Sequence, residues 1–119
     1  MTMVRETFFA IEVRDMARAT AFYGAAVGAV VKFASAEWTS LDVAGVRVAL
    51  SLNVAAAPVR TGLHFVVDDV GAAQADIVRA GGAAAGAAIA VAPGVVIADV
   101  ADGEGNAFTL SQRARPPGA

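Results

Sequence analysis

The sequence predicts an α+β fold in which two βαβββ modules form a curved, partly open eight-stranded sheet with the helices on the outside. The main observation is an internal repeat, Phe8-Phe-Ala-Ile-Glu-Val-Arg-Asp15 and Gly62-Leu-His-Phe-Val-Val-Asp-Asp69. Each copy is an apolar run that reaches an Asp and continues into a small-residue stretch with helical character. Because the copies lie about half the chain apart, we expect two similar units that bury a shared apolar surface. Any pocket should lie on that surface.

The order of elements in the first half, about residues 6–53, is the second observation. Residues rich in Phe, Ile and Val predict a strand, and Asp15 follows at the position of a helix N-cap. Gly28 closes the expected helix, and Val43-Ala-Gly-Val46 supplies a tight turn between the last two strands. The expected strand, helix and three further strands are residues 6–13, 16–27, 30–35, 37–43 and 46–53.

The second half, about residues 62–112, repeats this order after a connector at residues 55–61. Asp69 is the expected N-cap, and Gly81-Gly82 ends the helix. Residues 83–92 have low complexity, and only the symmetry of the repeat predicts a strand there. The expected elements are residues 63–68, 70–80, 83–92, 95–101 and 107–112, and we expect the tail 113–119 to be disordered.

Composition fits one domain over residues 1–119, and it excludes several classes of function. The net charge is −2 with no basic block, which argues against nucleic acid as a partner. No apolar run is long enough for a membrane span, no signal peptide is recognisable, and the cytoplasm is the expected location. The chain has no cysteine, so disulfides, thiolate catalysis and zinc–thiolate sites are excluded.

The hydrophobic fraction is 57%, which is high for a soluble domain of this size. Two explanations fit equally well. The excess indicates a further apolar surface that is covered in a homodimer or larger oligomer. Alternatively, it reflects a general bias toward Ala, Gly, Val and Arg, in line with the dominance of Arg among the basic residues.

Three segments together resemble the vicinal oxygen chelate superfamily, which includes glyoxalase I, methylmalonyl-CoA epimerase, extradiol dioxygenases and bleomycin resistance proteins. The first is Ile11-Glu-Val-Arg-Asp15 leading to Ala21-Phe-Tyr23 and Gly28, and the second is Phe65-Val-Val-Asp-Asp69 leading to Gly81-Gly82. The third, Asp102-Gly-Glu-Gly-Asn-Ala-Phe-Thr-Leu110, is similar to the family's Asp-Pro-Asp-Gly-Asn turn before the last strand. The resemblance covers about residues 6–112 and implies a homodimer.

Enzymes of this superfamily usually hold a divalent metal on the concave sheet, with His, Gln or Glu ligands from the first and last strands of each half. The resemblance places those ligand positions at Phe8, Ala49, Gly62 and Thr109. These residue types cannot supply the ionised or imidazole donors that a metal needs. We therefore expect no metal and no other cofactor.

Glu12 and His64 are the polar candidates for the concave surface, because strand side chains alternate between faces. If residues 8 and 62 face the cleft, Glu12 and His64 do too, and either could bind a ligand or transfer a proton. Alternatively, His64 is a core histidine with satisfied hydrogen bonds, and Glu12 is a carboxylate at the rim paired with Arg14, Arg47 or another basic group. We favour the cleft for Glu12, since a buried lone carboxylate is costly.

Trp38, the only tryptophan, and Phe33 nearby could form an aromatic wall that stacks on a planar ligand. Packing in the core or in a dimer explains Trp38 equally well. Phe22 and Tyr23 are expected in the core, and Phe108 beneath the sheet. The candidate ligand-binding residues are Phe8, Glu12, Phe33, Trp38, Ala49, His64 and Thr109.

Three functions remain open. The first is metal-independent binding of an apolar or aromatic small molecule, as in the bleomycin resistance proteins. The purpose of such binding could be to sequester an antibiotic. The second is a lyase, isomerase or dioxygenase-like enzyme that uses Glu12 or His64 in acid–base catalysis. The third and weakest is a metal enzyme with a rearranged site made of His64, Glu12 and Asp99.

Overall fold

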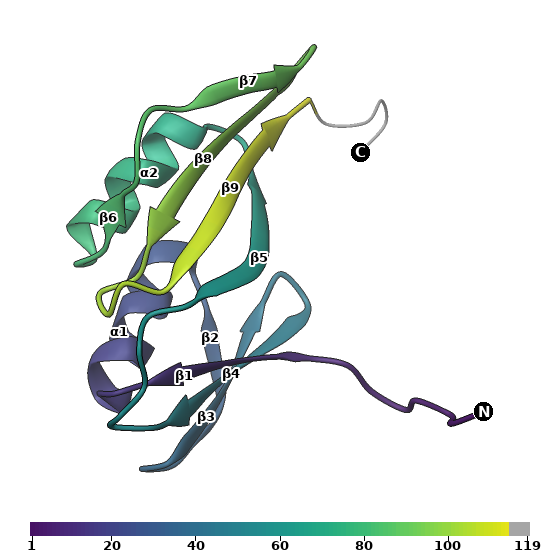
Figure 1. Cartoon of the computed structure of the whole chain (residues 1–119), viewed down its shortest axis with the longest axis vertical. Helices are drawn as coiled ribbons and strands as arrows, with labels where there is room; N and C mark the ends of the chain where they lie inside the picture. Colours follow the sequence, from purple (N-terminus) through teal and green to yellow (C-terminus); the bar gives the residue numbers. More distant parts are fainter. Residues whose placement is uncertain (115–119) are drawn as a thin grey trace. The chain divides into compact units, whose positions relative to one another are not determined.

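The computed structural model describes residues 1–114, and its chain divides into two compact units, Met1–Ala56 and Ala57–Ala119. Each unit has one helix and one sheet (Figure 1). The first sheet has four strands and the second has five. This arrangement confirms the predicted α+β fold of two βαβββ modules.

The first unit contains one mixed sheet with the strand order β1-β4-β3-β2. The first and last strands of the unit, β1 and β4, are parallel neighbours at one edge of the sheet, with Ile11 beside Leu50, and the other neighbours are antiparallel. The elements are β1 (Phe9–Val13), α1 (Met16–Val27), β2 (Val30–Ala34), β3 (Trp38–Val43) and β4 (Val46–Leu52).

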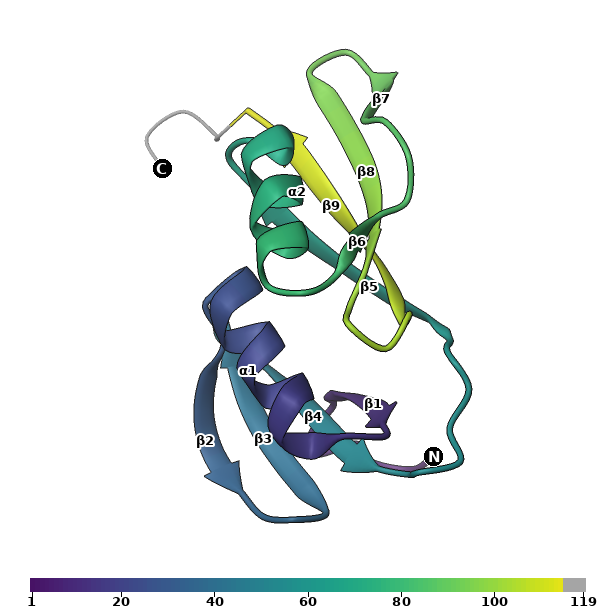
Figure 2. The same ribbon diagram turned by 90° about the vertical axis from the view of Figure 1, so that its left-hand side faces the viewer.

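Helix α1 lies across one face of this sheet (Figure 2). Its start is fixed by Asp15, whose carboxylate accepts the Arg18 N–H at 3.1 Å, and its end by Gly28 in the left-handed region (φ +68°). Phe22 and Tyr23 are buried, with their rings edge to face at 5.0 Å. The predicted cap, helix bounds and core positions are therefore confirmed.

The second unit has the order β5-β9-β8-β6, and β7 also pairs with β8. As in the first unit, the first and last strands are parallel neighbours, with Phe65 beside Leu110. The elements are β5 (Arg60–Val67), α2 (Val70–Arg79), β6 (Ala83–Ala84), β7 (Ile89–Ala92), β8 (Val95–Ala101) and β9 (Ala107–Arg113).

Asp69 caps α2 by accepting the Ala72 N–H at 3.0 Å, as predicted. The helix packs over β8, β6 and β9 (Figure 2). Phe108 lies in the core beneath the sheet, edge to face with Phe65 at 5.4 Å. The helix ends at the predicted glycines, where the Gly82 N–H reaches the Ile77 carbonyl at 2.9 Å and Gly81 has φ +104°.

Several boundaries differ from the prediction, among them the start of β1 at Phe9 instead of residue 6. Residues 83–92 form two short strands instead of one, because Gly86 (φ +122°) interrupts the run. Strand β5 starts at Arg60, within the predicted connector, since Ala107 donates its N–H to the Val59 carbonyl at 2.8 Å and begins the pairing early. Strand β9 continues to Arg113, and the predicted disorder at 115–119 falls outside the described residues.

Candidate ligand-binding surfaces

The first unit presents a sheet face that α1 does not cover, which we call the first open face. Strand alternation and the pairing of Glu12 with Ser51 and of Ser40 with Ala49 define it. Opposite side chains such as Ile11, Leu41 and Leu50 are buried. The first open face consists of Phe8, Ala10, Glu12, Phe33, Trp38, Ser40, Asp42, Arg47, Ala49 and Ser51.

Aromatic side chains occupy one part of the first open face. The rings of Phe8 and Trp38 meet edge to face, with their centroids 6.1 Å apart. The Arg47 guanidinium lies over the Phe8 ring at 5.5 Å, which is a cation–π distance. Phe33 stands on the next strand, opposite Ser40, and is 57% exposed. We call Phe8, Phe33 and Trp38 the aromatic patch.

Trp38 has its polar atom already satisfied, because its Nε1–H donates to the Ser40 hydroxyl at 3.1 Å. This contact holds the indole in one orientation and leaves its ring half-buried. The prediction of core packing for Trp38 is therefore only partly met, since part of the ring stays accessible on the first open face. An accessible, fixed indole is suited to stacking against a planar group.

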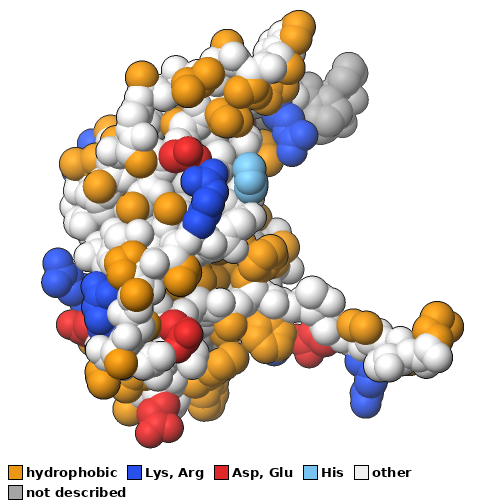
Figure 3. Space-filling view, viewed as in Figure 1, with side chains coloured by type: hydrophobic (Ala, Val, Ile, Leu, Met, Phe, Trp, Pro, Cys, Tyr) orange, Lys and Arg blue, Asp and Glu red, His pale blue; other side chains and the backbone are white. Residues whose placement is uncertain are grey.

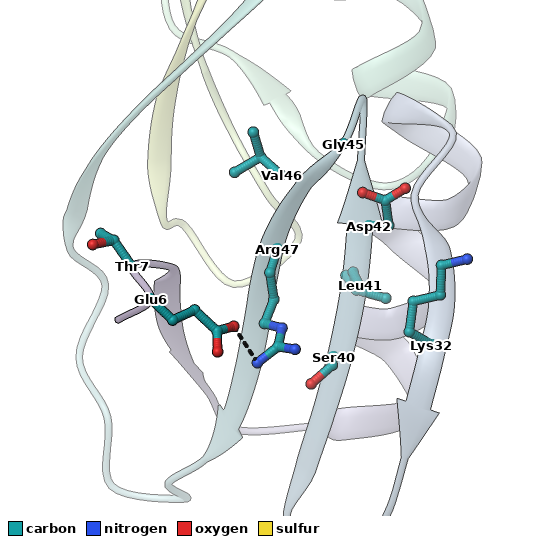
Figure 4. Close-up of a pocket in the computed structure, with 9 residues that line it drawn as sticks. All are labelled: Glu6, Thr7, Lys32, Ser40, Leu41, Asp42, Gly45, Val46 and Arg47. Atoms are coloured by element: carbon teal, nitrogen blue, oxygen red, sulfur yellow. Dashed lines mark ion pairs between the residues drawn. The ribbon is translucent and has the colours of Figure 1, made fainter. Parts of the chain in front are cut away.

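A pocket of about 410 Å³ adjoins the aromatic patch (Figure 4). Arg47 and Ser40 connect the pocket to the patch, because each lines the pocket and contacts a patch residue. The Arg47 guanidinium also pairs with the Glu6 carboxylate at 2.8 Å. The lining residues are Glu6, Thr7, Lys32, Ser40, Leu41, Asp42, Gly45, Val46 and Arg47.

Glu12 is exposed on β1 and accepts a hydrogen bond from the Asn53 amide at 2.5 Å. That Glu12 contacts a ligand stays a prediction. Its partner is Asn53 and not the Arg14 or Arg47 of the alternative, since Arg47 pairs with Glu6. Asn53 reaches Glu12 because its own N–H is held by the Val13 carbonyl at 2.8 Å, just after the end of β1. Glu12 remains accessible for ligand contact.

The second unit has its own sheet face opposite α2, with a polar network in place of an aromatic patch. His64 pairs in register with Thr109, and Thr109 pairs with Asp99 on the next strand. The Thr109 hydroxyl donates to Asp99 Oδ1 at 2.8 Å, and Arg60 Nη2 lies 3.5 Å from the same oxygen. Figure 3 shows basic, acidic and histidine side chains gathered over these strands.

His64 is exposed, so the alternative of a core histidine is wrong. Strand alternation alone does not explain its position on the open face. Gly62 has φ +77°, and the register of β5 against β9 shifts between Arg60 and His64, so simple alternation from residue 62 does not hold there. The pairing with Thr109 is what places His64 on this face.

Two predicted site residues present almost no surface. Ala49 is 0% exposed and Thr109 is 3% exposed. Ala49 is enclosed between Ala10 and Ser40 on the neighbouring strands. The hydroxyl of Thr109 is occupied by Asp99. The contribution of Ala49 and Thr109 to ligand contact stays a prediction, and it requires ligand atoms to reach below the exposed surface.

Metal ligands do not assemble at the family positions. Phe8, Ala49 and Gly62 carry no donor atom in their side chains, and the Thr109 hydroxyl is a poor substitute for a carboxylate or imidazole. Within residues 1–114, no three side chains of the His, Cys, Asp or Glu type gather where one ion could bind them. The residues present therefore do not fit a divalent ion.

A glyoxalase-like domain model matches residues 8–111. The chain belongs to the glyoxalase-like family. This match spans both units and includes all the candidate site residues except the pocket residues Glu6 and Thr7. None of the curated proteins matches the chain.

Solved structures show the same fold. A glyoxalase/bleomycin resistance protein/dioxygenase family enzyme from Burkholderia phytofirmans has a TM-score of 0.78 at 20% identity, covering 90% of this chain and 97% of its own. The fosfomycin resistance protein FosX from Listeria monocytogenes has a TM-score of 0.78 at 14% identity, with coverage of 95% and 96%. A glyoxalase-related enzyme from Fulvimarina pelagi has 0.75 at 22%, with coverage of 92% and 89%.

Sequence reasoning missed Lys32, Asp42 and Arg60. Asp42 and Ser40 could have been found, because they follow Trp38 at a spacing of two in the same strand. Lys32 could not, since it lies at a register shift between Val31 and Phe33.

No helix among the described residues is long and apolar enough to cross a membrane.

Proposed function

We propose that this glyoxalase-like protein binds an apolar or aromatic small molecule without a metal. The observation that carries the proposal is the aromatic patch. Phe8 and Phe33 are 40% and 57% exposed, and Trp38 is fixed by Ser40 with its ring half-buried. Exposed aromatic rings on a sheet face cost solvation free energy, and a stacked ligand would recover it.

Binding without a metal follows from the residue types at the family's ligand positions. Phe8 takes part in ring contacts with Trp38 and Arg47. A side chain of this kind offers van der Waals contact to a ligand and no coordinate bond. The proposed ligand therefore lies against rings, and Glu12 on the same open face would contact its polar groups.

Antibiotic sequestration by a cytoplasmic homodimer is the biological setting that we propose. Two kinds of similar structure carry the words bleomycin resistance and fosfomycin resistance in their names. The dimer is supported by the 57% hydrophobic content and by exposed apolar side chains such as Val30, Ile89 and Val91. Analytical ultracentrifugation would show a dimer, and a monomer at all concentrations would contradict that part.

The ligand proposal is tested by calorimetric titration with naphthol, an uncharged planar probe, and by a thermal-shift screen of aromatic antibiotics. We expect naphthol to bind the wild-type chain. Phe33→Ala should weaken binding roughly two- to tenfold, the range for one lost aromatic contact. Val54→Ala, a change at an exposed valine outside the first open face, is the control and should have no effect. Absence of binding by naphthol and by every planar antibiotic would contradict the proposal.

A second candidate is an enzyme that uses Glu12 or His64 in acid–base catalysis. It is favoured by the exposure of both side chains, which leaves a proton-transfer atom of each within reach of a ligand. For any activity found with this protein, Glu12→Gln or His64→Gln should lower kcat by about 100-fold or more. Full activity in both variants would eliminate this candidate.

A further inference from the structure

The pocket beside the aromatic patch contains two charged side chains that lack an ion pair. Among residues 1–114, Lys32 and Asp42 form no ion pair, whereas Glu6 and Arg47 pair with each other at 2.8 Å. Figure 4 shows the Lys32 amine and the Asp42 carboxylate on neighbouring strands, with no dashed line joining them. The pocket therefore offers one available positive group and one available negative group.

The position of these charges follows from the strands that carry them. Lys32 lies at the register shift in β2, between Val31 and Phe33. Asp42 lies on β3, where its neighbour across the sheet is Arg47. Arg47 is held away from Asp42 by its contacts with Glu6 and the Phe8 ring. The Asp42 carboxylate is thus left to the pocket.

Ser40 supplies a further polar group at the boundary with the aromatic patch. Its oxygen accepts the Trp38 Nε1–H at 3.1 Å, so its own hydroxyl proton is free to be donated to another group. The pocket and the ring of Trp38 are consequently joined by one side chain. A ligand with its ring on the aromatic patch would have its substituents directed at Ser40 and the pocket.

We infer that the ligand of the first open face is an aromatic compound that carries both an ammonium and a carboxylate group, as aromatic amino acids and their derivatives do. Its ring lies on Phe33 and Trp38, its carboxylate is bound by Lys32 and Ser40, and its ammonium is bound by Asp42. The pocket volume of about 410 Å³ is within the range of small-molecule sites. This inference rests on the proposed function, because it assigns the ligand class of the same surface.

The test compares three probes that share a phenyl ring and differ in their ionic groups. Phenylalanine carries both an ammonium and a carboxylate, phenylpropionate only the carboxylate, and phenethylamine only the ammonium. Trp38 is the only tryptophan, so its fluorescence reports binding at the patch. We expect phenylalanine to bind roughly two- to fivefold more tightly than either singly charged probe, as one additional partly exposed ionic contact predicts. Equal affinity for all three probes would overturn the inference.

Two variants test the positive and the negative group of the pocket separately. Lys32→Met should weaken phenylpropionate and leave phenethylamine unchanged or tighter, and Asp42→Asn should do the reverse. Arg18→Met and Glu37→Gln remove matching charges at exposed positions outside the pocket and serve as controls. If both pocket variants affect the two probes alike, the charge assignment is wrong.

Failure of this inference can be told apart from failure of the proposed function by naphthol, which has neither charge. If naphthol binds and the charged probes are not discriminated, the aromatic site stands and the amino-acid class is rejected. If naphthol and all three charged probes fail to bind, both are rejected. Binding of phenylalanine with reversal of probe preference in the two variants supports both.

Discussion

The two units share their covered side and differ on their open side. Asp15 and Asp69 cap the helices with nearly equal hydrogen bonds of 3.1 and 3.0 Å, and in each unit the first and last strands are parallel neighbours. On the open side, the first unit carries rings and a pocket, and the second carries a polar network around Asp99. Packing against the helix fixes one face, so the other face is free to take different chemistry in each unit.

The largest effect that tests this comparison is a cavity in each core. Leu50 and Leu110 are almost completely buried on the last strands of the two units. Leu50→Ala and Leu110→Ala should each lower the free energy of unfolding by about 2–5 kcal/mol, because each removes buried methyl groups from a packed core. Urea unfolding measures both changes. A loss below about 1 kcal/mol in one variant would show that the two covered sides are not equivalent.

The turn before the last strand is stabilised in different ways in the two units, so different substitutions should destabilise it. In the second unit it depends on a side chain. Asn106 is buried, donates to Asp102 Oδ2 at 3.1 Å and accepts the Val59 N–H at 3.1 Å. Asn106→Ala removes the side-chain hydrogen bonds to Asp102 and to the Val59 N–H and should cost about 1–3 kcal/mol. Gly103→Ala in the same loop is the control, because Gly103 is not in the left-handed region and its added Cβ meets only the Gly81 carbonyl at 3.4 Å.

In the first unit the corresponding turn is held by backbone conformation instead of a side-chain network. Ala44 has φ +50° and Gly45 has φ +86°. Gly45→Ala should lower the free energy of unfolding by roughly 1–2 kcal/mol, the cost of a side chain in the left-handed region. Thermal unfolding would detect the loss. A change of opposite sign would mean that the turn relaxes to another conformation.

A smaller and equal effect is expected at the two caps. Asp15→Ala and Asp69→Ala each remove the acceptor for one N–H of the first helical turn, which is worth about 1 kcal/mol. Asp15→Asn and Asp69→Asn retain an acceptor and should change stability by only a few tenths of a kcal/mol. Chemical denaturation of the four variants measures the differences. Clearly unequal losses for the two alanine variants would break the equivalence of the caps.

The covered side could be predicted from the sequence because its rules are local. The caps at Asp15 and Asp69 follow from residue type and the apolar run before them, and Gly28 follows from the need for a left-handed residue. The strand at 83–92 could not be predicted in detail, since alanine and glycine give neither periodicity nor strand propensity.

The open side was less predictable because it depends on register. Trp38 and Phe33 could be identified as aromatic strand residues, and strand alternation places Glu12 on the open face, but its hydrogen bond to Asn53 could not be predicted. Lys32 is at a register shift that no sequence pattern announces. His64 reaches its face through a bulge at Gly62, which alternation alone does not describe.

The most direct test of the aromatic site is a nuclear magnetic resonance titration with naphthol, in which the single tryptophan gives a single indole N–H signal. The account predicts that the Trp38 indole signal and the backbone amides of Phe33 and Ser40 move together with increasing naphthol. A Trp38 signal that stays fixed while the amides around Arg60 and His64 move would contradict it.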